Sequence, residues 1–168
     1  MNSVKVNTSH VAILEFVNGY FQSKLAKESQ LFTTFICEFG RFCFTRSSQG
    51  LSSSGDHFCK VTDSFFSGIG DFLTKQVYDL LVQGSSESDL SQNLHTTLKE
   101  AREKGCTFSI SKFQAGTEVI TSGFLIKTDP TGKTKPKLGP DPARVEKLAK
   151  MQRPTNQTEV RSLLGLLT

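Results

Sequence analysis

The chain of 168 residues contains no tryptophan, only two tyrosines and no long apolar run. Its apolar runs are a few residues long, far short of the ~20 residues that span a bilayer. No basic stretch followed by an apolar run opens the chain, so we expect no secretory signal. We therefore expect an intracellular protein of the cytoplasm or nucleus, with no membrane partner and a core dominated by its 14 phenylalanines.

Cysteine and histidine are too few and too scattered to indicate a zinc site. The four cysteines form no C-x-x-C pair, and the three histidines are far apart in the sequence. Zinc sites usually have paired ligands at short spacing. We expect free thiols in a reducing compartment, with Cys37 and Cys43 acting as small apolar fillers beside a hairpin turn.

Positive charge is concentrated toward the C-terminus. Between Lys127 and Arg153 lie eight basic and three acidic residues, a local excess of five that is larger than the +4 of the whole chain. Such asymmetry suits a polyanion partner such as nucleic acid. It is also typical of a solvated charged face, and charge alone leaves both interpretations open.

Hydrophobic periodicity and turn residues predict an α+β fold with an antiparallel sheet packed on helices. Phe42 and Phe44 alternate onto one face and are expected in the core, and the serines and Asp56 of 52–56 are expected to cap a helix. The predicted elements, in order, are a strand at 10–16, a hairpin from 30–36 and 41–46, a helix after 52–56, two short strands within 71–84, a helix from 86 to 105, strands at 106–110 and 118–127, a helix from Asp141-Pro142 and a last helix capped by Asn156 and Glu159.

Two carboxylates stand out because they lie in apolar surroundings. Glu15 lies within the run VAILEF and Asp79 at the turn of KQVYDLLV. A buried acid is costly unless it is paired or binds a cation. Either each acid points out of the sheet or caps a turn, or the two share a site for Mg²⁺, a cation that prefers oxygen ligands.

Segments in a consistent order resemble the reverse transcriptases of Gypsy-like long-terminal-repeat retrotransposons, across roughly residues 10–168. The resemblance lies in VAILEFVNGYFQSKLAKESQLFTTF (11–35), SQGLSS (48–53), KQVYDLLVQG (75–84), TSGFLI (121–126) with GPDPARVEKL (139–148), and PTNQTEVRSLLGL (154–166).

The resemblance implies the palm of an RNA-directed DNA polymerase, with the two-metal chemistry of nucleotidyl transfer. It implies an N-terminal lead at 1–9, the palm at 10–150 and the start of a thumb or connection helix at 151–168. Only 14 residues precede Glu15, so the fingers of the family are expected to be absent.

The family's three active-site aspartates correspond to Glu15, Tyr78 and Asp79. Glu15 keeps the charge on a longer side chain, whereas the Tyr78 phenol, with an ordinary pKa near 10, is neutral at pH 7 and does not replace a bridging carboxylate. The resemblance thus implies weakened Mg²⁺ binding at Glu15 and Asp79 and a severe loss of polymerisation.

Other positions match the family's substrate-binding residues. Tyr20, Gln49 and Gly50 match residues near the incoming nucleotide. Without the resemblance, a core aromatic explains Tyr20 equally well, and composition alone favours an ordinary loop at Gln49 and Gly50. Lys133, Lys135 and Lys137 are expected to contact nucleic acid. The implied partners are an RNA template, a DNA primer and a dNTP.

The sequence therefore supports three hypotheses. The first is a reverse transcriptase palm fragment of a retrotransposon polyprotein that is catalytically defective. The alternatives are a non-catalytic nucleic-acid-binding module and a retroelement relic without function. The sequence does not determine the oligomeric state.

Overall fold

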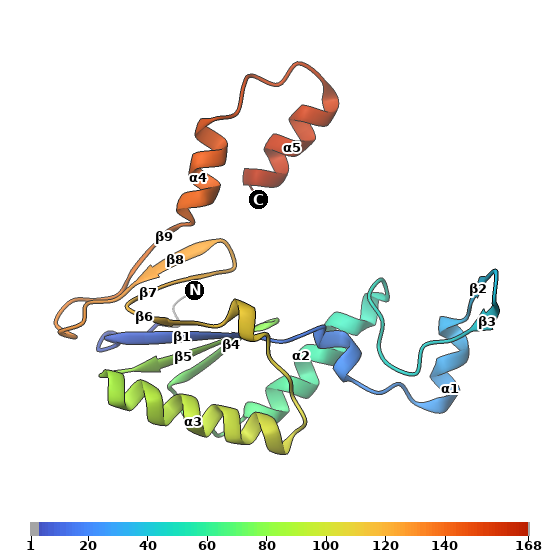
Figure 1. Cartoon of the computed structure of the whole chain (residues 1–168), viewed down its shortest axis with the longest axis horizontal. Coiled ribbons are helices and arrows are strands. Elements are labelled where there is room, and N and C mark those ends of the chain that lie inside the picture. Colours follow the sequence, from blue (N-terminus) through green and yellow to red (C-terminus); the bar gives the residue numbers. More distant parts are fainter. Residues whose placement is uncertain (1–3, 168) are drawn as a thin grey trace.

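A central antiparallel sheet organises the chain (Figure 1). The computed structural model describes residues 4–167. The apolar run that starts at His10 forms a central strand, flanked on one side by the hairpin from 71 to 84 and on the other by a short later strand. The strand order is β4-β5-β1-β6, with bounds Leu73–Gln76, Asp79–Gly84, His10–Glu15 and Gln114–Gly116.

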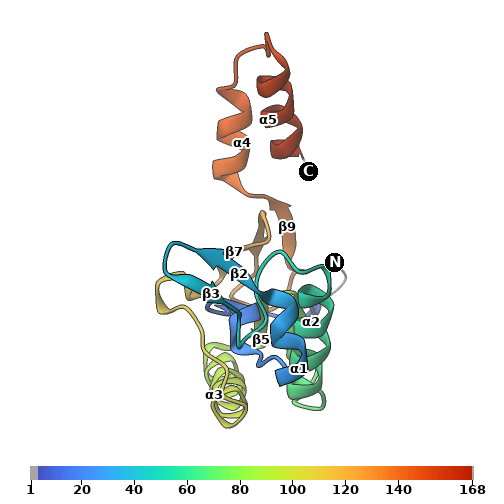
Figure 2. The same cartoon turned by 90° about the vertical axis from the view of Figure 1, so that its right-hand side faces the viewer.

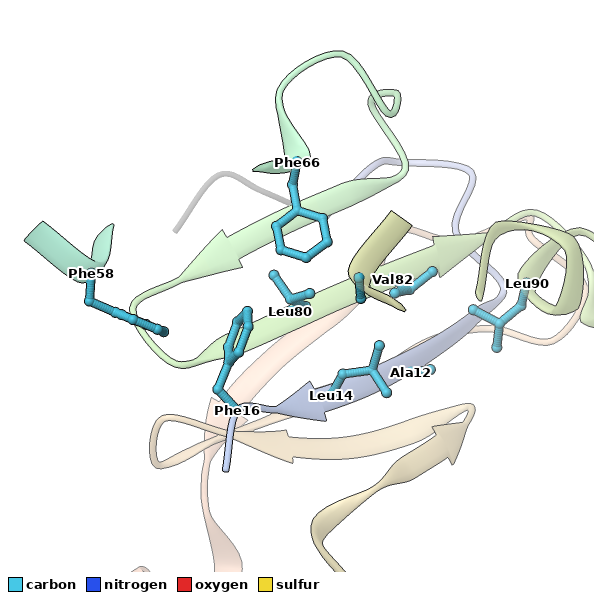
Figure 3. Close-up of a cluster of buried hydrophobic side chains, with 9 residues drawn as sticks. Ala12, Leu14, Phe16, Phe58, Phe66, Leu80, Val82 and Leu90 are labelled. Atoms are coloured by element: carbon cyan, nitrogen blue, oxygen red, sulfur yellow. The ribbon is translucent and has the colours of Figure 1, made fainter. Parts of the chain in front are cut away.

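Two helices cover one face of this sheet and form the main core (Figure 3). They are α2 (Ser52–Phe66) and α3 (Glu87–Glu103). Side chains at alternate positions of β1 and β5 point toward these helices because successive residues of a strand face opposite sides. The buried cluster comprises Ala12, Leu14, Phe16, Phe58, Phe66, Leu80, Val82, Leu90 and Ala101.

A three-stranded antiparallel sheet packs on the opposite face. Its order is β7-β8-β9, with bounds Glu118–Thr121, Phe124–Lys127 and Lys137–Pro140. The other set of alternating residues of β1 and β5 packs against it in a smaller buried cluster of Val11, Ile13, Leu81, Val119 and Ile126.

The segment between β1 and α2 extends away from the central sheet (Figure 1). It contains η1 (Gly19–Gln22), α1 (Lys27–Gln30), η2 (Leu31–Thr33) and a hairpin of β2 (Phe35–Cys37) and β3 (Gly40–Phe42). This segment carries several of the most exposed large apolar side chains, namely Leu31, Phe32, Ile36 and Phe39.

Two C-terminal helices extend from β9, and Figures 1 and 2 agree on this arrangement. They are α4 (Pro142–Ala149) and α5 (Gln157–Leu167). The Asp141 side chain caps α4 by accepting from the Ala143 N–H. A short helix, η3 (Ile110–Lys112), lies earlier in the chain, just before β6. The predicted capping pair is present: the Asn156 side-chain oxygen accepts from the Glu159 N–H, and the Asn156 side-chain amide donates to the Glu159 carboxylate. Within residues 4–167, no helix combines the length and apolarity that a membrane crossing requires.

The α+β class with antiparallel sheets is confirmed, but some predicted elements are wrong. Residues 106–110 form a connection rather than a strand, with an isolated bridge from Phe108 to Phe16 just after β1. The single strand predicted at 118–127 is a hairpin, because Ser122 and Gly123 turn the chain with positive φ. Strand β9 was not predicted, since its few apolar residues lie within a basic segment.

Three predictions about single residues are also wrong. Phe42 is 47% exposed, because the β2–β3 hairpin projects away from the core. Cys37 and Cys43 are exposed free thiols for the same reason. The serines of 52–56 lie inside α2, whose first residue is Ser52 and whose N-terminal flanking residue, Leu51, has no side-chain cap.

Candidate functional site at the end of the central sheet

Glu15 and Asp79 are directly opposite each other across β1 and β5. Glu15 is the last residue of β1, Asp79 is the first of β5, and the antiparallel register pairs them. Opposite residues of an antiparallel pair have Cβ atoms about 4.5–5.5 Å apart. By alternation both side chains lie on the face of Ile13 and Leu81, toward the β7–β8 hairpin. The structure therefore brings the two predicted acids together.

Each carboxylate has a partner from the later part of the chain. The Lys112 ammonium forms an ion pair with Glu15 Oε1. The Thr121 hydroxyl donates to Asp79 Oδ2 at 2.7 Å, and the Ser122 hydroxyl lies 3.4 Å from the same oxygen. These groups line an open hollow of about 390 Å³ at the sheet end. Both acids of the hollow therefore already have side-chain partners.

The Tyr78 ring lies on the opposite face of the sheet. Its ring centroid is 5.2 Å from that of Tyr20 and 5.5 Å from that of Phe58, so it belongs to the aromatic cluster on the helix side. Burial, reinforced by a hydrogen bond with Tyr20, raises the pKa of Tyr78 well above its ordinary value. The phenol is therefore neutral and packed against the core.

Gly19 makes this aromatic cluster possible. Asn18 adopts a left-handed conformation (φ 46°), which turns the chain from β1 into η1. A Cβ at Gly19 would lie 2.9 Å from Phe58 Cζ and 3.0 Å from Tyr78 Cδ1. The absence of a side chain at Gly19 thus lets Tyr20 and Tyr78 close over α2.

The residues predicted to bind a nucleotide are not all gathered at one point. Tyr20 lies in η1 and packs on Phe58 of α2, with ring centroids 5.8 Å apart. Gln49 and Gly50 lie in the exposed turn before α2, and Gly50 has φ 91°. The Tyr20 ring is half-buried against its neighbours, whereas Gln49 is open to solvent.

The basic segment approaches the acids from the side of β9. Lys135 and Lys137 line a cavity of about 320 Å³, to which Asp79 and Thr121 also contribute. Lys133 lies in the loop before β9. At the start of that loop, Asp129 accepts hydrogen bonds from Thr131 and Thr134.

These hydrogen bonds to Asp129 give its loop a defined turn. The Thr131 backbone N–H and hydroxyl donate at 2.9 and 2.8 Å, and the Thr134 N–H donates at 3.0 Å. They favour the charged form and lower the pKa of Asp129 to about 2. The turn positions the start of the lysine-bearing loop.

The donor set does not fit a two-metal clamp. Over residues 4–167 there is no group of three or more His, Cys, Asp or Glu side chains that could hold a metal ion. A site of this kind clamps the attacking and leaving oxygens with two cations and needs several oxygen ligands. Glu15 and Asp79 supply two carboxylates, and Glu15 already faces an ammonium group.

Sequence reasoning missed Lys112 as a member of the site. The sequence predicts a strand at 106–110 and assigns no role to Lys112. The only usable signal was a lone lysine in the short segment SISKF between α3 and the next strand. Nothing in its spacing indicated that this segment returns to the end of β1.

Comparison with known proteins gives matches to viral polyproteins. No family model matches the chain. It is 26% identical over 180 residues to the Gag-Pol polyprotein of baboon endogenous virus, covering 98% of this chain and 10% of that protein. An uncharacterised protein of Caenorhabditis elegans is 26% identical over 154 residues, covering 90% of this chain and 11% of that protein.

A third relative is the polyprotein P3 of Commelina yellow mottle virus, 28% identical over 103 residues, which cover 61% of this chain and 6% of that protein. The chain thus spans about a tenth or less of the length of these curated relatives. Activities and partners of the whole proteins do not follow from so short a match.

Solved structures share the fold over almost the whole chain. The foamy viral protease-reverse transcriptase in complex with RNA/DNA hybrid gives a TM-score of 0.86 at 24% identity, covering 98% of this chain and 21% of that chain. The same protein in complex with double-stranded DNA gives 0.83 at 24% identity, covering 98% of this chain and 28% of that one.

The chain is therefore similar in sequence to retroviral polyproteins and in fold to a viral reverse transcriptase. The predicted resemblance to reverse transcriptases is confirmed at this level. The narrower assignment to Gypsy-like elements stays a prediction, as do the domain bounds at residues 9 and 150.

Proposed function

We propose that this chain is the palm portion, with the start of the thumb or connection, of a Gypsy-like retroelement reverse transcriptase, and that it binds primed nucleic acid without extending it. Three observations support the palm: the ordered motifs, the antiparallel sheet covered by α2 and α3, and the pairing of Glu15 with Asp79 at the strand end. An intracellular location remains part of this proposal.

The proposed catalytic defect rests on the residues that stand at the expected acid positions. Nucleotidyl transfer by two metal ions needs clustered acids. Here the position expected to bridge the metals carries Tyr78, whose neutral phenol packs on Tyr20. Glu15 is longer than aspartate by one methylene, which moves its carboxylate by about 1 Å, and catalytic geometry tolerates about 0.5 Å. Tight binding of Mg²⁺ is therefore not part of this proposal.

The proposed ligand is a primed RNA–DNA duplex. The foamy viral reverse transcriptase of the same fold is described in complex with RNA/DNA hybrid and with double-stranded DNA. In this chain Lys133, Lys135 and Lys137 form the basic approach to the sheet end. Because the half-buried Tyr20 ring packs on Tyr78 and Phe58, nucleotide binding beside Tyr20, Gln49 and Gly50 is expected to be weak.

Primer extension tests the proposal directly. The purified chain is incubated with a primed RNA template, dNTPs and Mg²⁺ or Mn²⁺, while anisotropy of a labelled hybrid reports binding. We expect binding without incorporation. Incorporation by the unmodified chain would overturn the defect.

Substitution of both altered positions tests the cause of the defect. In a context that supplies the remainder of a reverse transcriptase, Glu15→Asp with Tyr78→Asp is expected to restore extension. The matched control is Glu15→Asp with Tyr78→Phe, which corrects the length of residue 15 without adding a carboxylate and is expected to stay inactive. Equal activity of the two variants would show that position 78 does not limit catalysis.

A second candidate function is a module retained for nucleic-acid binding alone, which the basic segment favours. It predicts binding that weakens steeply with salt and no recovery of extension in any variant. A relic without function would show neither hybrid binding nor a cooperative melting transition by circular dichroism.

A further inference from the structure

The Glu15–Asp79 pair requires a positive counter-group. Two like charges directly opposite each other on an antiparallel pair are destabilising. Both side chains are only partly exposed at the end of a buried sheet, and the Glu15 side chain is 31% exposed. In a family of metal-dependent polymerases the counter-charge would be a divalent cation, but this chain presents an ammonium group instead.

We propose that the Lys112 ammonium is the resident counter-cation of the Glu15–Asp79 pair and keeps divalent metal ions out of it. This inference rests on the proposed function, since it assigns a cause to weak metal binding. Two observations support the inference: the ion pair of Lys112 with Glu15, and the attachment of the segment that bears Lys112 to the end of β1.

Backbone hydrogen bonds attach this segment to the end of β1. The Ser109 N–H donates to the Glu15 carbonyl at 2.9 Å, and the Val17 N–H donates to the Thr107 carbonyl at 3.1 Å. The rings of Phe108 and Phe16 pack with centroids 4.8 Å apart. Lys112 therefore starts from a fixed backbone position close to Glu15, and its ion pair does not depend on a chance encounter.

The Gln22 side chain fixes the same segment a second time. Its amide nitrogen donates to the Thr107 carbonyl and its amide oxygen accepts from the Thr107 N–H, both at 3.0 Å. These two bonds connect η1 to the segment that carries Lys112. The position of the lysine is thus set by β1 and η1 together.

Asp79, the second acid of the pair, also has hydrogen-bond donors from the protein itself. Asp79 Oδ2 accepts from Thr121 at 2.7 Å, with Ser122 at 3.4 Å from the same atom. A divalent cation that bridged both carboxylates would compete with Lys112 for the Glu15 carboxylate and with these hydroxyl donors for Asp79. A tethered ammonium is held at high local concentration by its backbone and wins this competition.

Mn²⁺ binding to the full chain, followed by electron paramagnetic resonance, tests the proposal. We expect no saturable site in the unmodified chain at millimolar Mn²⁺. Lys112→Met is expected to bind Mn²⁺ about tenfold more tightly or better, because one positive charge close to the pair is removed. The gain is expected to vanish in Lys112→Met with Glu15→Gln.

Two control variants distinguish the effect of the positive charge at position 112 on Mn²⁺ binding from the effect of removing any lysine. Lys112→Arg keeps the charge and is expected to behave like the unmodified chain. Lys99→Met removes an exposed lysine from α3, on the other face of the sheet, and is expected to bind no additional Mn²⁺. Circular dichroism melting of every variant confirms that the fold is retained.

Two results would overturn the inference. One is a saturable, Glu15-dependent Mn²⁺ site of equal affinity in the unmodified chain and Lys112→Met. The other is the absence of any gain in folded Lys112→Met. Hybrid binding measured on the same samples keeps the proposed function separate, since loss of hybrid binding contradicts that function and leaves the metal result unaffected.

Discussion

At position 78, one side chain connects the predicted active site to the hydrophobic core. The family pattern places an acid here, and an acid would be costly against the rings of Tyr20 and Phe58. A phenol fits this surrounding, since it adds an aromatic contact and its hydroxyl reaches Tyr20. The tyrosine at this expected metal-ligand position therefore packs between η1, α2 and the β4–β5 turn.

The raised pKa of Tyr78 predicts a loss of stability in alkaline solution. In the unfolded chain the phenol ionises near pH 10, whereas in the folded chain burial holds it protonated to higher pH. Above pH 10 the unfolded state therefore binds fewer protons than the native state, and the free energy of unfolding falls as pH rises. By about pH 11 the loss is expected to be about 1 kcal/mol.

Urea unfolding between about pH 8 and about pH 11 measures this effect. Tyr78→Phe is expected to lose stability less steeply above pH 10 than the unmodified chain. Tyr20→Phe is the control, because burial, the main cause of the shift, still acts on Tyr78 in that variant. An unchanged slope in Tyr78→Phe would contradict the assignment.

The junction between β5 and α3 shows how one element positions another. Ser86 caps α3 by accepting from the Asp89 N–H at 3.1 Å, and Asp89 in turn accepts from the Ser85 N–H at 2.8 Å. A Cβ at Gly84 would lie 2.4 Å from the Leu90 nitrogen. The last residue of β5 therefore lies directly against the first turns of α3, which brings Leu90 into the core.

Gly84→Ala is expected to destabilise the fold by about 1–3 kcal/mol, the usual cost of forcing an extra methyl group into a packed contact. The atom in contact is backbone, so it moves only if α3 moves. Gly139→Ala in β9 is the matched control, because no atom lies within 4 Å of the added Cβ. Equal midpoints of the two variants in urea unfolding would refute the close approach of β5 and α3.

Over the whole molecule, the two faces of the central sheet differ in their cover. Helices α2 and α3 lie on one face, and the β7–β9 sheet with the basic loop lies on the other, from which α4 and α5 extend (Figures 1 and 2). The acids of the site face the second side. Lys135 and Lys137 line one cavity with Asp79 on this side, and the exposed Lys133 precedes them in the loop before β9.

Replacing these three lysines by alanine is expected to weaken hybrid binding and to flatten its salt dependence. Each phosphate contact contributes about 0.9 to the slope of log K against log salt on a duplex, so the slope is expected to fall by up to about 2.7. Anisotropy titrations at several salt concentrations measure it.

The control has the same change in net charge on the other face of the sheet. In this control, three exposed residues are changed to alanine: Lys60 of α2, and Lys99 and Arg102 of α3. We expect this variant to keep the slope of the unmodified chain. Equal salt-dependence slopes for the two triple variants would show that positive charge promotes hybrid binding from either face of the sheet.

Much of the local structure could be predicted from the sequence. The apolar run at β1, the Asp-Pro start of α4 and the Asn156–Glu159 capping pair are local signals, and all three are confirmed. The Phe-rich hairpin was also predicted, but the predicted burial of Phe42 is wrong, because whether a strand is covered depends on what packs on it. Phe42 is exposed for this reason.

The sequence by itself determined which residues are acids, phenols and bases, and in what order they occur along the chain. That was sufficient to predict the α+β class, the reverse transcriptase-like resemblance and the proximity of Glu15 to Asp79. Only the tertiary structure decided that Tyr78 faces the core and that Lys112 faces Glu15, because both contacts join segments that are distant in the chain. Such contacts depend on strand register and on the path of a loop, which local patterns do not encode.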